Sequence, residues 1–175
     1  LEDENFDKEN FKKFKNIEDI LEAFNGTYLI NGLESMKSIE SNSVDYLFSH
    51  SVLEHIKLYD IENYIYEMHR IIKPTGLISH NIDYKDHLSK SLNNLRFSES
   101  VWESKIFSNS GFYTNRVPAV EMHKKFIRGG FEIIWENFGS WKKLPLKRKY
   151  IHKSFKIYSN DDLKKCSSAF IAKKK

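Results

Sequence analysis

Hydrophobic and polar positions along residues 43–83 form the clearest pattern in the chain. Val44–Phe48 is an apolar run of strand length and β-favouring composition, and a polar loop follows at residues 49–51. Helical spacing then relates Ile61, Ile65, Met68 and Ile72. Proline and glycine within residues 73–76 predict the end of that helix, and Leu77–Ile82 has the composition of a second strand. Strand, helix and strand in this order predict a right-handed crossover between two parallel strands.

Weaker patterns on both sides of this unit predict further elements. Asn16 can cap a helix that runs to Phe24, and Thr27–Ile30 resembles a short strand. The later expected elements are a helix beginning at Pro118 and closed by Gly129-Gly130, a strand at Phe131–Trp135, a helical turn at residues 161–163 and a strand at Ser168–Ala172. Residues 83–115 show no clear periodicity, and their aromatic side chains argue against disorder.

The order of residues in the central unit resembles a known family. SVDYLFSHSVLEHI, followed by EMHRIIKPTGLI, is similar to the fourth strand, fourth helix and fifth strand of class I S-adenosylmethionine (SAM)-dependent methyltransferases. That family has an Asp-containing strand, a Leu-Glu-His turn and a helix ending in Arg-x-Leu-Lys-Pro-Gly-Gly. Here Ile72 stands in the Leu position and Thr75 replaces the first Gly. A weaker likeness continues through Asn115-Arg116 and residues 130–133.

The resemblance implies an α/β fold over residues 1–175, taken as a single domain. Its sheet would be a partial Rossmann-like sheet, with a parallel centre and an antiparallel edge pair. The resemblance begins at the family's third strand, near residue 27, so the methyltransferase core would be incomplete. Residues 142–175 would form a basic edge region at the C-terminal end.

The family's cofactor, SAM, is implied along with the fold. The residues just after the fourth strand contact the methionine end of SAM in the family, which here are Ser49 and His50, with Ser51 beside them. A polar residue after the third strand contacts the adenine, and Glu34 and Ser35 are the candidates. Ligands of open α/β sheets collect beyond the carboxyl ends of the strands, which independently favours residues 49–51.

The family's reaction is transfer of a methyl group, and we expect a small-molecule or sugar-like acceptor. His55 is the candidate general base, because a neutral imidazole titrates near working pH. Asp83 and Tyr84 follow the second strand and are candidates for contact with the substrate. The insertion after the fifth strand forms part of the acceptor pocket in similar methyltransferases, which adds Arg96 and Trp102. Alternatively, His55 caps or packs structurally, and the insertion packs over the sheet edge.

SAM needs two anchors that a sequence can show, a glycine-rich turn after the first strand and an acidic residue that closes the second. The first is missing, because none of the seven glycines forms a Gly-x-Gly turn or lies between a strand and a helix ahead of residue 27. The strand at Val44–Phe48 would then expose an unpaired edge. We expect residues 28–30, upstream residues or a partner chain to cover it, and the chain to be a C-terminal fragment that begins, at Leu1, where something has been removed. The alternative function is a non-catalytic remnant or interaction module.

Composition narrows the class of protein. Hydrophobic residues make up 40% of the chain and aromatic residues 14%, which favours a globular protein, and no run is long enough to predict a membrane span. Cys166 is the single cysteine, so no internal disulfide can form and a cytoplasmic location is expected. Two histidines five positions apart, His50 and His55, lack a dependable third ligand, so no metal site is expected.

Charge is distributed unevenly. The net charge is +4, but residues 142–175 carry twelve Lys or Arg against two Asp, and the rest of the chain is acidic. A basic end is compatible with nucleic-acid binding. However, its aromatics are not spaced like a base-stacking platform, so we expect a solvated loop and a frayed lysine tail instead.

Overall fold

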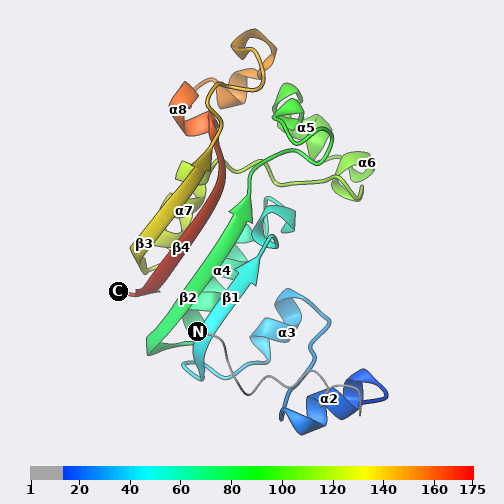
Figure 1. Ribbon diagram of the computed structural model, residues 1–175, viewed down its shortest axis with the longest axis vertical. Coiled ribbons are helices and arrows are strands. Elements are labelled where there is room, and N and C mark those ends of the chain that lie inside the picture. Colours follow the sequence, from blue (N-terminus) through cyan, green and yellow to red (C-terminus); the bar gives the residue numbers. More distant parts are fainter. Residues whose placement is uncertain (1–13) are drawn as a thin grey trace.

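One four-stranded sheet organises the protein. The computed structural model describes residues 14–175, and its strands are β1 (Val44–His50), β2 (Ile72–Asp83), β3 (Phe131–Ser140) and β4 (Lys165–Lys174). Their order across the sheet is β1-β2-β4-β3 (Figure 1). β1 and β2 are parallel, while β4 is antiparallel to both of its neighbours. The expected fold class, with a parallel centre and an antiparallel edge pair, is confirmed.

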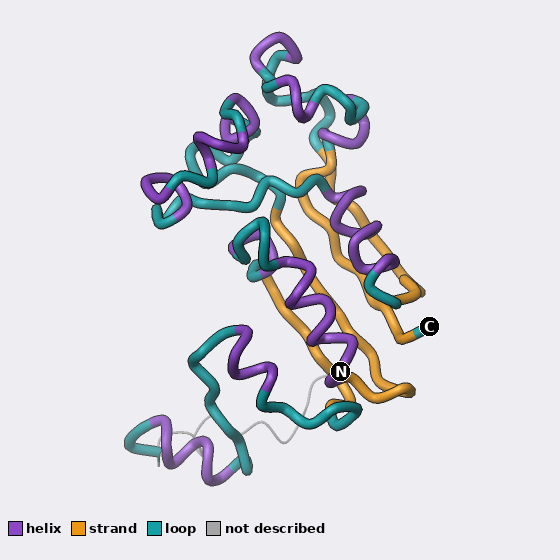
Figure 2. The backbone as a smooth tube through the Cα atoms, turned by 180° about the vertical axis from the view of Figure 1, so that it is seen from behind, coloured by secondary structure: helices purple, strands orange, loops and turns teal. Residues whose placement is uncertain are grey.

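Two helices cover one face of the sheet, as Figure 2 shows from behind. Within residues 14–175, all the α-helices of the structure are α2 (Ile17–Ala23), α3 (Leu33–Lys37), α4 (Ile61–Ile71), α5 (Glu99–Trp102), α6 (Lys105–Ser108), α7 (Ala119–Arg128) and α8 (Asn160–Leu163). α4 and α7 pack on the sheet, and the core between them contains Ile65, Ile78, Phe126 and Phe170. No helix within residues 14–175 is both long and apolar enough to cross a membrane.

The central crossover forms because the apolar side chains along one side of its helix are buried against the sheet. Ile61, Ile65 and Met68 are buried on one side of α4, against the even-numbered residues of β2. The predicted end of the helix at residues 73–76 is wrong, because α4 ends at Ile71 and β2 begins at the next residue. Residues 73–76 bulge out of the strand, since Val44 pairs with Ile72 and Tyr46 already pairs with Leu77.

The predicted strand at Thr27–Ile30 is also wrong. These residues form irregular chain, and the side chains of Tyr28 and Ile30 are 68% and 75% exposed. A run of four β-favouring residues becomes a strand only when a neighbouring strand accepts its hydrogen bonds, and β1 does not. β1 therefore remains an edge of the sheet within the described residues. Tyr46 and Phe48 stack on each other there and are 55% and 71% exposed.

The basic segment is folded rather than a loose loop, which corrects the expectation from charge. The connection between β3 and β4 packs on the segment after β2, in a second small core of Leu92, Leu95, Leu146, Ile151 and Leu163. Arg148 ties this connection together by donating hydrogen bonds to the carbonyls of Lys156 and Tyr158. Lys173 and Lys174 belong to β4, so the expected lysine tail is largely strand.

Candidate functional site

The carboxyl ends of β1 and β2 lie side by side, as the parallel crossover requires (Figure 1). Ser51 directly follows β1 in a left-handed conformation, with a φ of 52°, and its N–H donates to the carbonyl of Asn81 at 2.9 Å. Asp83 closes β2. Tyr84 follows it and joins β4 through a hydrogen bond between its hydroxyl and Ser168 Oγ at 2.8 Å. The expected meeting of residues 49–51 with Asp83 and Tyr84 at one sheet end is confirmed.

The other cofactor candidates are not all directed to this end. The Ser49 hydroxyl lies 2.7 Å from Nδ1 of His80 on the helix-covered face of the sheet, whereas His50 is exposed. Glu34 is on α3, where it forms an ion pair with Lys37 at 2.7 Å. Ser35 Oγ accepts a hydrogen bond from the N–H of Asn31. Among residues 14–175, no hydrogen bond or ion pair connects α3 with residues 49–51.

His55 is held in an orientation that fixes its tautomer. It ends a 3-10 helix, Leu53–His55, and its Nδ1 lies 3.0 Å from the carbonyl oxygen of Tyr113. A carbonyl can only accept, so Nδ1 carries the hydrogen and Nε2 of the neutral ring is free to take a proton. The ring is exposed and meets the edge of His87 at a centroid distance of 4.8 Å.

Asn115 fastens the turn that carries His55. Its buried side chain donates to the carbonyls of Leu53 at 2.8 Å and Ile56 at 3.0 Å, and its backbone N–H donates to the carbonyl of Glu54 at 2.8 Å. Asn115 Oδ1 accepts from the N–H of Val117. One side chain thus connects the segment before α7 to the turn after β1.

Arg116 is buried among polar and aromatic groups. Its guanidinium lies between the rings of Trp102 and Phe155, at 5.3 and 5.2 Å. It donates to the carbonyls of Asn94 and Phe97, and Glu103 lies 3.9 Å away. Burial lowers the pKa of Arg116 to about 10, so the group stays charged at neutral pH.

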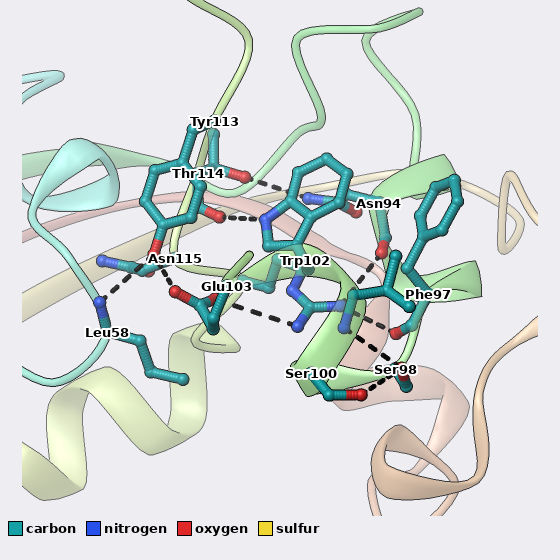
Figure 3. Close-up of polar contacts among 12 residues, drawn as sticks. Leu58, Asn94, Phe97, Ser98, Ser100, Trp102, Glu103, Tyr113, Thr114 and Asn115 are labelled. Atoms are coloured by element: carbon teal, nitrogen blue, oxygen red, sulfur yellow. Dashed lines mark hydrogen bonds and ion pairs between the residues drawn. The ribbon is translucent and has the colours of Figure 1, made fainter. Parts of the chain in front are cut away.

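The two candidates in the insertion do not line the pockets. Trp102 is fully buried, and its indole N–H donates to the carbonyl of Thr114 at 2.7 Å (Figure 3). Arg96 is exposed on the opposite side of that loop, and its guanidinium lies 5.0 Å from the ring of Tyr150. Their role in binding substrate stays a prediction.

A small pocket with a mostly apolar lining lies beside the end of β2 and offers about 20 Å³ of free space. Its polar lining residues include Glu54, Asp83, Tyr84, Asn94 and Arg116. Of these, Asp83 and Tyr84 were candidates from the sequence. Asn94 and Arg116 were missed, because neither carries a local signal that separates it from a surface residue. Glu54 had one signal, its place in the Leu-Glu-His turn. A larger hollow of about 230 Å³ shares residues 115–118 with this pocket and is also lined by Glu121 and Tyr158.

His80 predicts a marked sensitivity of the fold to acid. Its ring is 1% exposed, and burial lowers its pKa from 6.5 to about 4. Below pH 6.5, His80 binds a proton in the unfolded chain but stays neutral in the folded chain until the pH approaches 4. The free energy of unfolding therefore falls as the pH falls through this range. We expect the free energy of unfolding to drop by roughly 3 kcal/mol between pH 6.5 and pH 4 from this residue alone.

Urea unfolding at several pH values measures this loss. His80→Gln does not titrate and keeps a side-chain oxygen for the Ser49 hydroxyl, so its stability should depend less on pH by about that amount. His152→Gln, in a surface turn, serves as the control and should behave like the wild type. Equal pH dependence of His80→Gln and the wild type would contradict the prediction.

A search for metal ligands gives no candidate. No group of three or more His, Cys, Asp or Glu side chains within residues 14–175 is arranged so that it could hold a metal ion.

Comparison with known proteins agrees with the fold. Residues 8–79 match the family model described as a methyltransferase domain. No curated protein matches the sequence. Similar solved structures include a SAM-dependent methyltransferase from Archaeoglobus fulgidus, with a TM-score of 0.53 and 12% identity over 92% of this chain and 73% of that one. The [4+2]-cyclase SpnF gives a TM-score of 0.51 and 10% identity over 90% of this chain and 60% of its own.

A SAM-dependent methyltransferase from Methanosarcina mazei gives a TM-score of 0.51 and 14% identity, with 78% of this chain and 62% of that one covered. The chain thus spans less than two thirds of the length of two of these three proteins. At such identities the likeness shows the fold alone. The match over residues 8–79 and the shared fold together support the resemblance to a class I methyltransferase domain.

Proposed function

We propose that this domain takes part in transferring the methyl group of SAM to a small-molecule or sugar-like acceptor. The observation that supports this best is the parallel β1–α4–β2 unit, which brings residues 49–51 together with Asp83 and Tyr84 beside a small pocket. Ligand sites of open α/β sheets lie at this end of the strands. The activity of the whole protein, its acceptor and its partners are proposals.

The residues present fit one end of SAM. The exposed His50 and the left-handed turn at Ser51 would hold the methionine end, because polar side-chain and backbone groups are accessible where β1 stops. Glu34 and Ser35 remain candidates for the adenine. The 175 residues contain no Gly-x-Gly turn for close approach of backbone to the cofactor. When bound, SAM supplies an electrophilic methyl group.

The protein's own contribution is to position the acceptor and to accept its proton. A displacement at a methyl group depends mainly on how the two reactants are held. Nε2 of His55 is the nitrogen available for a proton, because Nδ1 is occupied by the carbonyl of Tyr113. Asp83 and Tyr84 line the pocket next to this turn and are proposed to contact the acceptor. Arg96 is proposed to contact it from the insertion, whereas the fully buried Trp102 would act only by supporting that insertion.

Calorimetric titration with SAM tests the cofactor part of the proposal. We expect the 175-residue chain by itself to bind SAM weakly or not at all, because it lacks the Gly-x-Gly turn that allows close approach of backbone to the cofactor. Tritium transfer from methyl-labelled SAM to a small-molecule extract, with the protein as its gene encodes it, tests the activity. Low-micromolar binding by the 175 residues would refute the expectation that a glycine-rich turn is required, and absence of any transfer would refute the proposed activity.

A second candidate function, an interaction module, is favoured by the free edge of β1. The exposed and stacked rings of Tyr46 and Phe48 lie on a strand whose outer side has no partner within the described residues. Edges of this kind are pairing sites for another strand. A folded protein that associates with a partner chain but transfers no methyl group would favour this reading.

A cytoplasmic location is part of the proposal and rests on the single cysteine.

A further inference from the structure

The small pocket beside the end of β2 contains a buried carboxylate without a partner. Glu54 is 2% exposed, and neither of its side-chain oxygens has a hydrogen-bond partner among the described residues. The other charged side chains that line the pocket are compensated: Asp83 lies 3.1 Å from Lys85, Asp162 lies 3.8 Å from Lys165, and Arg116 lies 3.9 Å from Glu103. Glu54 is the one left unpaired by the described part of the chain.

An unpaired carboxylate in this position opposes folding. Burying a charge without a counter-ion costs free energy, and buried polar groups in native proteins nearly always have a partner. Burial raises the pKa of Glu54, and the nearby Asp83 carboxylate raises it further. The backbone N–H groups of Glu54 and Asp83 are close enough to moderate that rise, although neither completes a hydrogen bond with the carboxylate. A ligand that brings hydrogen-bond donors would remove the cost.

The free atoms of the pocket specify the chemistry of such a ligand. Glu54 offers two acceptor oxygens, and Asn94 Oδ1 is a third buried acceptor without a partner in residues 14–175. The amide of Asn94 cannot simply turn over, because its Nδ2 donates to Thr114 Oγ1 at 3.0 Å. Beside Glu54, a ligand group must therefore bring several N–H or O–H donors, and the unpaired carboxylate of Glu54 favours a positive charge there. Arg116 Nε is a buried donor without a partner in residues 14–175 at the same pocket, and an acceptor atom elsewhere on the ligand would satisfy it.

The size of the pocket restricts the ligand group further. Free space of about 20 Å³ admits one water-sized group and no more. A primary ammonium group combines that size with three donors and a positive charge. Quaternary or branched cations do not fit, and a neutral hydroxyl leaves the carboxylate without a counter-ion.

We propose that this pocket binds the protonated primary amino group of the methyl acceptor, with Glu54 as its counter-ion and Asn94 as a further hydrogen-bond acceptor. That the ligand is the methyl acceptor rests on the proposed function, whereas the ammonium site itself does not. Asn115 positions Glu54 by holding the carbonyls on both sides of it. This ammonium site restricts the proposed methyl acceptors to small molecules that carry a primary amine.

Methylammonium chloride is the probe for a test. Its binding to the isotopically labelled 175-residue chain is followed by the amide NMR shifts of Glu54, Tyr84 and Asn115. We expect saturable shifts with a dissociation constant in the millimolar range, as suits a ligand of two heavy atoms. Glu54→Gln should weaken binding by roughly tenfold or more, since the counter-ion is lost while the shape is kept. Glu40→Gln removes a carboxylate from the surface and should change nothing.

Sodium chloride is the control for ionic strength, and tetramethylammonium chloride is the control for the size of the cation. Neither salt should reproduce the shifts. This comparison needs no variant, so it stays decisive even where Glu54→Gln does not fold. The proposal is overturned by an absence of saturable shifts, which would leave the pocket to a water molecule. Equal binding by Glu54→Gln, or equal shifts with tetramethylammonium, would overturn it as well. Methylammonium binding without any methyl transfer would keep the ammonium site and discard the proposed function.

Discussion

Replacing His55 by asparagine is expected to slow methyl transfer by about 10²- to 10⁴-fold, the usual contribution of a positioned general base. The physical reason is the fixed tautomer. Nδ1 lies 3.0 Å from the carbonyl oxygen of Tyr113 and donates its hydrogen there, so Nε2 is the nitrogen left to accept a proton from the acceptor. Asparagine preserves a donor for that carbonyl but offers no basic nitrogen.

The measurement is tritium transfer from methyl-labelled SAM at several pH values, with the protein as its gene encodes it. His152→Asn is the matched control, because His152 lies in a surface turn before residues 153–155 and should leave the rate unchanged. A merely structural His55 would give a different pattern. In that case the rate of His55→Asn would fall in proportion to its folded fraction, and its pH profile would match that of the wild type.

Replacing Asn115 by alanine is expected to lower the free energy of unfolding by roughly 3 kcal/mol. The side chain makes three buried hydrogen bonds, to the carbonyls of Leu53 and Ile56 and from the N–H of Val117, and each is worth about 1 kcal/mol. Alanine leaves these groups without their side-chain partner. The turn that carries Glu54 and His55 should loosen with it.

Urea denaturation followed by circular dichroism gives the stability change. Asn137→Ala, on an exposed position of β3, is the control and should stay within about 0.5 kcal/mol of the wild type. A loss below about 1 kcal/mol for Asn115→Ala would mean that the turn is held by its surroundings rather than by this side chain. Faster amide hydrogen exchange at Glu54 and His55 in Asn115→Ala would independently support the conclusion that the Asn115 side chain holds this turn.

The central crossover was predictable because its information is local. The stripe of Ile61, Ile65 and Met68 has helical spacing, and two apolar runs of strand length flank it, so periodicity alone identifies the three elements. Their parallel arrangement follows from the handedness of crossover connections. The ends of the elements were less accurate. Residues 73–76 contain the expected helix breakers, yet α4 stops earlier and these residues bulge from β2, because pairing of Ile72 with Val44 begins the strand.

The candidate site was predictable only in part. Residues 49–51, His55, Asp83 and Tyr84 could be nominated, because the carboxyl ends of neighbouring parallel strands must meet. Arg116 could not, since an arginine before a helix is exposed in most proteins and only packing between Trp102 and Phe155 makes it buried. Trp102 shows the opposite error: an aromatic residue in an insertion suggested contact with substrate, and its ring is fully enclosed.

What the sequence determined by itself is the βαβ unit, the sheet end where a ligand would lie, and the family likeness carried by the Leu-Glu-His turn. These depend on residues within one helix or strand length of each other. Tertiary structure alone decided that residues 28–30 are not a strand, that the basic segment has its own core, and that Glu54 is buried without a partner. Each of these depends on contacts between segments far apart in the chain, and burial and hydrogen bonding are settled only once those segments meet.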